Sequence, residues 1–125
     1  MTTVEPRRSV LVIEDEADLR TLMELVLEGG GYTVLTASDG REGLEVLRRA
    51  RPDVILLDMK MPVMDGWEFA KRYREMHADR APIVVLTAAA DARARAEEIG
   101  AVKSLGKPVE LDELFATIRD AMSLR

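Results

Sequence analysis

Residues 51–68 read RPDVILLDMKMPVMDGWE, in which an aliphatic run follows turn residues and ends in an acid. A run of four aliphatic residues, Val54–Leu57, is typical of a short strand that is buried on both faces of a sheet. Similar runs predict further strands at Val10–Ile13 and Ile83–Leu86, with weaker candidates at Tyr32–Ala37 and Val102–Leu105. We therefore predict five short strands.

Segments with helical spacing separate these strands. In the first of them, the apolar face that we expect to be buried consists of Leu19, Leu22, Met23, Val26 and Leu27. The triplet Gly29–Gly31 should end this helix, because glycine permits a left-handed backbone. Asp39 and Glu42 have the spacing of a capping box and predict the start of a second helix.

Three more helices are predicted farther along the chain. Phe69, Ala70 and Tyr73 mark the third, and Leu111, Leu114, Phe115, Ile118 and Met122 mark the last. The fourth, at about Asp91–Ile99, consists mostly of alanine and charged residues, so it should dock weakly on the sheet. Strand and helix alternate five times, which predicts one α/β domain with a parallel, doubly wound sheet, covering residues 1–125 with a core at about 9–122.

Composition excludes several kinds of protein. The 125 residues contain no cysteine and one histidine, His77, which excludes thiol chemistry and a histidine-rich metal site. The net charge of −5 argues against direct nucleic-acid binding, which normally needs a basic face. No apolar run approaches the roughly 20 residues that cross a membrane, and no signal peptide is recognisable. We expect a cytoplasmic protein whose chemistry uses carboxylates, lysines and hydroxyl groups.

Polar side chains follow the predicted strands at their carboxyl ends, where open parallel sheets bind ligands. They are Glu14 and Asp15 after the first strand, Asp58 after the third, Thr87 after the fourth and Lys107 after the fifth. Three clustered carboxylates repel one another and favour a bound cation. Oxygen ligands without histidine favour Mg²⁺, with Mn²⁺ as a possible substitute.

This set of groups suits phosphoryl transfer. Asp58 could act as the nucleophile and form an aspartyl phosphate, while the cation, Lys107 and Thr87 would balance the charge of the phosphoryl oxygens. The plain alternative is that Asp15 and Asp58 only cap helices or solvate loop ends. A haloacid-dehalogenase-type phosphatase is a third reading, but such enzymes carry the nucleophile on the first strand and a second Asp two residues later, where this chain has Lys60.

The segment RPDVILLDMKMPVMDGWE, together with the later VVLTA and KP, resembles the receiver domain of two-component response regulators. The resemblance extends from Val10 to about Met122 and implies a flavodoxin-like (βα)5 fold with strand order 2-1-3-4-5. It also implies that Asp58 is the phosphoacceptor, which makes the chain a phosphorylation-activated switch in a phosphorelay and not a turnover enzyme.

The resemblance assigns the remaining roles as well. Asp15, Asp58 and the main-chain carbonyl of Lys60 correspond to metal ligands, and Glu14 stands where many members carry Asp and suits a water-mediated contact. Thr87 and Lys107 correspond to the phosphoryl-binding hydroxyl and ammonium groups. Lys107–Pro108 corresponds to a cis peptide bond of the family.

Two further positions concern the conformational switch and the rate of hydrolysis. Ser104 stands where family members usually carry a switch aromatic, which leaves that step of the switch open. The side chain of Lys60 can lie over the phosphoryl site, and we hypothesise that it alters the rate of hydrolysis.

The resemblance implies a histidine kinase or histidine phosphotransfer protein as donor and a protein effector as output. Leu25 is a candidate donor contact, and the chain could be a monomer or a phosphorylation-dependent dimer of the single-domain type. A degenerate receiver that acts only as a protein-binding scaffold remains the alternative.

Overall fold

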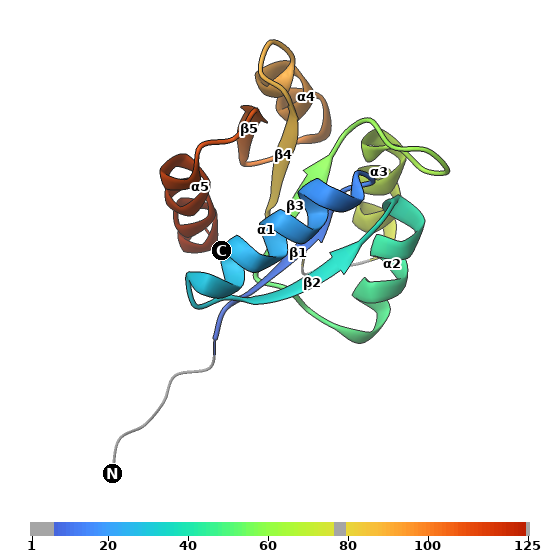
Figure 1. Cartoon of the computed structure of the whole chain (residues 1–125). Helices are drawn as coiled ribbons and strands as arrows, with labels where there is room; N and C mark the ends of the chain where they lie inside the picture. The colour runs from blue at the N-terminus through green and yellow to red at the C-terminus, as the bar shows by residue number, and fades with distance from the viewer. Residues whose placement is uncertain (1–6, 77–79, 125) are drawn as a thin grey trace.

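In the computed structural model, residues 7–76 and 80–124 are described. Five strands alternate with five helices (Figure 1). The elements are β1 (Ser9–Ile13), α1 (Ala17–Gly29), β2 (Thr33–Ala37), α2 (Gly40–Arg49), β3 (Val54–Asp58), α3 (Gly66–Met76), β4 (Ile83–Ala88), α4 (Ala92–Ile99), β5 (Lys103–Lys107) and α5 (Leu111–Ser123). All five predicted strands and all five predicted helices are therefore confirmed. His77 lies outside the described residues.

The strands form one parallel sheet in the order β2-β1-β3-β4-β5, as predicted. Successive side chains of a strand point to opposite faces, so each strand contributes to two apolar layers. Leu11, Ile55 and Val85 belong to the layer under α2, α3 and α4, whereas their neighbours belong to the layer under α1 and α5. Figure 1 shows α1 and α5 on one side of the sheet and α2 and α3 on the other.

The register of the sheet brings the strand ends together. Ile13 is opposite Leu57, and Asp58 is opposite Leu86, so the residues that follow β1, β3 and β4 meet at one edge. Thr87 is opposite Gly106, and Ala88 is opposite Lys107. The carboxyl edge of the sheet therefore collects the polar residues that the sequence placed after the strands.

Local sequence explains where the first two helices begin and end. α1 ends at the glycine triplet, where Gly31 has a φ of 96°, as predicted. The Asp39 side chain caps α2 by accepting from the Glu42 amide at 2.8 Å. The return bond of a capping box is replaced by Ser38, whose hydroxyl donates to the Glu42 carboxylate at 2.7 Å.

One prediction for α1 is wrong. Leu22 was expected on the buried face, yet 54% of it is exposed. It lies on the flank of α1, where a shallow groove lined by Leu19, Val109 and Leu111 separates α1 from the start of α5. Helical periodicity identifies the side of a helix that faces the protein, but the width of the covered strip depends on how closely the neighbouring helix approaches.

Candidate functional site

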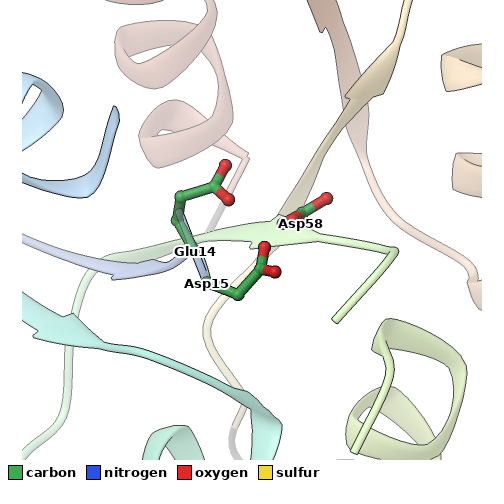
Figure 2. Close-up of side chains that lie close together, drawn as sticks. All are labelled: Glu14, Asp15 and Asp58. Atoms are coloured by element: carbon green, nitrogen blue, oxygen red, sulfur yellow. The ribbon is translucent and has the colours of Figure 1, made fainter. Parts of the chain in front are cut away.

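The carboxyl edge of the sheet carries three carboxylates within one small volume (Figure 2). Glu14 and Asp15 follow β1, and Asp58 is the last residue of β3. One carboxylate oxygen of each residue lies within 4.8 Å of the others. Glu14 is fully buried and Asp58 is 3% exposed, whereas Asp15 faces solvent. The predicted acidic cluster therefore exists in the fold.

Lys107 reaches this cluster from the end of β5. Its Nζ lies 2.8 Å from Glu14 Oε1 and 3.7 Å from Asp58 Oδ2. The peptide bond from Lys107 to Pro108 is cis, as the resemblance implies. The Glu14 carboxylate pairs directly with Lys107 and accepts from the Glu16 amide at 3.1 Å, and its predicted water-mediated contact with a metal stays a prediction.

Two backbone interactions hold the loops that carry these groups. The Lys60 amide donates to Asp58 Oδ1 at 3.3 Å, and the Arg20 guanidinium donates to the carbonyl of Glu14 at 2.8 Å. The Arg20 contact was not predicted, because an arginine one helical turn into α1 looks like an ordinary surface residue. Thr87 is 2% exposed, and β4 places it one residue beyond the partner of Asp58.

The carboxylates lie close together, and the pKa values of Asp58 and Asp15 shift in opposite directions. Burial, reinforced by the charge of Glu14 and hydrogen bonding with Asp15, raises the pKa of Asp58 to about 7. Burial opposes ionisation of Asp15 as well, but hydrogen bonds from Asp58 and Glu14 outweigh it and hold the pKa of Asp15 below its usual value. For Lys107, burial is outweighed by Glu14 and Asp58, which raise its pKa. The ammonium group is therefore charged at neutral pH.

The donor set fits a hard divalent cation. With all three carboxylates ionised, Glu14, Asp15 and Asp58 carry three negative charges and Lys107 offsets one of them. The remaining excess of two negative charges and the all-oxygen ligands match Mg²⁺, which commonly takes one or two carboxylates and keeps several waters. The arrangement can thus hold a cation beside a buried nucleophilic carboxylate, with an ammonium group on its other side.

Comparison with known proteins decides the family. The sequence profile of the response regulator receiver domain matches residues 10–119. The chain belongs to this family. It is a receiver domain of two-component signalling, a signalling domain and not a turnover enzyme. Receiver domains interact with histidine kinases or phosphotransfer proteins and with effectors.

Individual relatives agree with this assignment. The chain is 30% identical over 118 residues to sporulation initiation phosphotransferase F of Bacillus subtilis, covering 93% of this chain and 94% of that protein. It is 39% identical over 118 residues to a probable transcriptional regulator of Guillardia theta, covering 93% of this chain and 46% of the relative. The chain thus spans about half the length of that regulator and only a quarter of some other curated relatives.

A solved structure provides the same fold with a metal ion. The receiver domain of a sensor histidine kinase from Pseudomonas aeruginosa was solved with a magnesium ion coordinated in its active-site cleft. It is 30% identical to this chain with a TM-score of 0.85, and the match covers 94% of this chain and 99% of the other.

In the part of this receiver that the structure describes, no helix has the length and apolar character needed to span a membrane.

Proposed function

We propose that Asp58 accepts a phosphoryl group with the help of Mg²⁺, and that the resulting conformational change alters the binding of a partner. The observation that carries this proposal is the position of Asp58 on the central strand β3. Its buried carboxylate there lies in one cluster with Asp15 and Glu14 and 3.7 Å from the ammonium group of Lys107.

The chemistry follows from these positions. A carboxylate oxygen of Asp58 forms a bond to phosphorus while the bond between phosphorus and a donor histidine nitrogen breaks. Lys107 is close enough to move from Glu14 toward the arriving phosphoryl oxygens, and the Thr87 hydroxyl would donate to one of them. Asp15, Asp58 and the Lys60 carbonyl would hold Mg²⁺ directly, with Glu14 behind them. Bound there, the ion would neutralise charge on the phosphoryl oxygens.

A hollow between the start of α1 and the segment that follows β5 is the surface that we assign to the phosphodonor. It runs beside Lys107 and Pro108, and its lining includes Leu22 together with the acidic residues Glu16 and Asp18. Leu25, on the same helix, is 63% exposed, in agreement with its predicted place away from the buried face. An apolar centre with an acidic rim suits a donor helix that presents apolar residues flanked by lysine or arginine.

Beryllofluoride with Mg²⁺ tests the switch, since it imitates a phosphoryl group on a carboxylate. Trp67 fluorescence and amide NMR shifts should change in the wild type and stay constant in Asp58→Asn. Incubation with acetyl phosphate followed by mass spectrometry should add one phosphoryl group at Asp58. If the wild type gives no response in either experiment, the switch proposal fails and the scaffold function is favoured.

A further inference from the structure

α4 offers the sheet small side chains, with one large apolar residue among those it buries. Its eight residues bury only Ala92, Ala96 and Ile99, in agreement with the sparse apolar content of its sequence. Two alanine methyl groups and one isoleucine remove less apolar area from water than the three buried aliphatic side chains of α2, Leu44, Val46 and Leu47. Asp91 precedes α4 without capping it through its side chain. Apolar packing alone therefore holds α4 weakly.

Polar contacts from α3 supplement this packing. The indole Nε1 of Trp67 donates to Glu98 Oε1 at 2.8 Å, and the guanidinium carbon of Arg95 lies 5.5 Å from the centre of the indole ring. Arg95 also holds Glu98 through Nε and Nη2, each at 3.0 Å. We call these three residues the Trp67 cluster. At the same C-terminal end of α4, Arg74 of α3 donates to the carbonyl of Ile99.

A backbone hydrogen bond links the residue before Trp67 to the residue that follows the phosphoacceptor strand. Its neighbour Gly66 donates its amide to the carbonyl of Met59, the residue after Asp58, at 3.1 Å. A β-carbon at Gly66 would lie 2.9 Å from Met59 Cα and would overlap Met59 Sδ, so only glycine permits this close approach. Movement at Asp58 and Met59 must consequently displace the start of α3, where Trp67 lies.

The start of α4 is joined just as closely to the other side of the site. Three residues after Thr87 lead to Asp91 and α4, and the middle one, Ala89, packs tightly against β5. A β-carbon at Gly106 would lie 2.5 Å from Ala89 Cα. Because only three residues separate Thr87 from Asp91, movement of Thr87 toward a phosphoryl group should displace this loop and the start of α4.

We propose that Trp67 is a positioning residue that, through Glu98 and Arg95, holds α4 in the conformation of the unphosphorylated chain. This inference rests on the proposed phosphorylation of Asp58 and adds a restraint on the switch. The Trp67 cluster joins the start of α3 to the C-terminal half of α4, and these helices follow the two segments, after Asp58 and after Thr87, that the reaction should displace. Breaking the cluster then favours the phosphorylated conformation, because a contact of the other conformation is lost.

The test is calorimetric titration of the full chain with beryllofluoride in saturating Mg²⁺. Glu98→Ala should tighten apparent binding about three- to tenfold, and Trp67→Phe should act in the same direction. Glu98→Gln keeps an acceptor for the indole, so it should fall between wild type and Glu98→Ala. Glu97→Ala is the matched control, since Glu97 lies on the exposed face of α4, 4.0 Å from Arg93, and should leave binding within about twofold of wild type.

A merely structural role for the cluster predicts a different result. In that case Glu98→Ala and Trp67→Phe lower the free energy of unfolding and leave the affinity for beryllofluoride equal or weaker. The proposed restraint predicts lower stability together with tighter beryllofluoride binding. Equal or weaker affinity in both Glu98→Ala and Trp67→Phe overturns the inference alone, provided that the wild type binds. Failure of the wild type to bind beryllofluoride at Asp58 overturns the proposed function and this inference together.

Discussion

Along β3, Val54 to Leu57 are fully buried aliphatic side chains, and the next residue, Asp58, is almost as deeply buried but carries a carboxylate. The same change occurs after β1, where Ile13 is followed by the fully buried Glu14. We call the buried aliphatic residues within the strands the body of the sheet, and the buried acids at the ends of the strands its carboxyl edge. Burial stabilises the fold in the body and opposes ionisation at the edge. The buried acids at the carboxyl edge are therefore held in place by stability that the body of the sheet generates.

A cavity in the body should have the largest effect. Leu56 is fully buried on the α1 and α5 side of the sheet. Leu56→Ala should lower the free energy of unfolding by about 2–5 kcal/mol, because it removes apolar contacts and leaves a cavity. Urea denaturation measures this loss. A cost below that range would indicate that the body is not the main source of stability.

Removing the charge at the edge should act in the opposite direction. The pKa of Asp58 is about 7 in the folded chain and near 3.8 when unfolded, so the folded state keeps a proton that the unfolded state releases. The contribution of Asp58 to stability is therefore present below pH 4 and lost as the pH rises through 7. Asp58→Asn should be about 1–2 kcal/mol more stable than wild type at pH 8 without metal, allowing for screening by solvent and Lys107.

The pH profile provides the control for that variant. The difference between Asp58→Asn and wild type should fall as the pH drops below 7 and approach zero below about pH 4, where the Asp58 carboxyl is neutral in both the folded and the unfolded chain. A difference that stays constant from pH 4 to pH 8 would mean that packing or hydrogen bonding, and not the charge of Asp58, separates the two proteins.

A smaller gain is expected in the loop that leaves the edge. Val63 has a φ of 68° although it is β-branched, and 78% of it is exposed, so it combines backbone strain with little burial. Val63→Asn should stabilise the chain by about 0.5–1 kcal/mol, because asparagine tolerates the left-handed region. Thermal or urea unfolding measures the gain. Val63→Thr retains the branched β-carbon and should show none.

The smallest effect on stability is expected at Lys60, whose side chain is exposed beside Asp58. Lys60→Ala should change the free energy of unfolding by no more than about 0.5 kcal/mol. If the side chain covers the phosphoryl site, its removal should admit water and shorten the lifetime of phosphorylated Asp58 by roughly twofold or more. Decay after acetyl phosphate labelling measures the lifetime, with Lys71→Ala as control. An unchanged lifetime would refute this role.

The strands and helices could be predicted because each one has a recognisable pattern in its own short stretch of sequence. The run Val54–Leu57 and the turn residues around it identify β3 without reference to any other part of the chain. The polar cluster was predictable for the same reason, since parallel strands must bring the residues after Ile13, Leu57, Leu86 and Gly106 to one edge.

Contacts between distant side chains were not predictable in this way. Leu22 was predicted to be buried and is half exposed, because the approach of α5 decides what α1 covers. The hydrogen bond from Trp67 to Glu98 spans 31 positions, and no local pattern of the sequence predicts it. The direct pair between Glu14 and Lys107 likewise depends on side-chain reach in the folded chain.

The strand order leaves β2 and β5 each with one side that has no partner strand in the described sheet. β5 begins and ends with lysine and contains a glycine, both of which discourage pairing with another chain. β2 reads TVLTA, has no charged residue and is rich in β-forming side chains. The two edge strands thus differ in how well they resist pairing with another chain, and aggregation of partly unfolded chains should start at β2. Light scattering during refolding of Thr33→Lys would measure how far one added charge on β2 suppresses this aggregation.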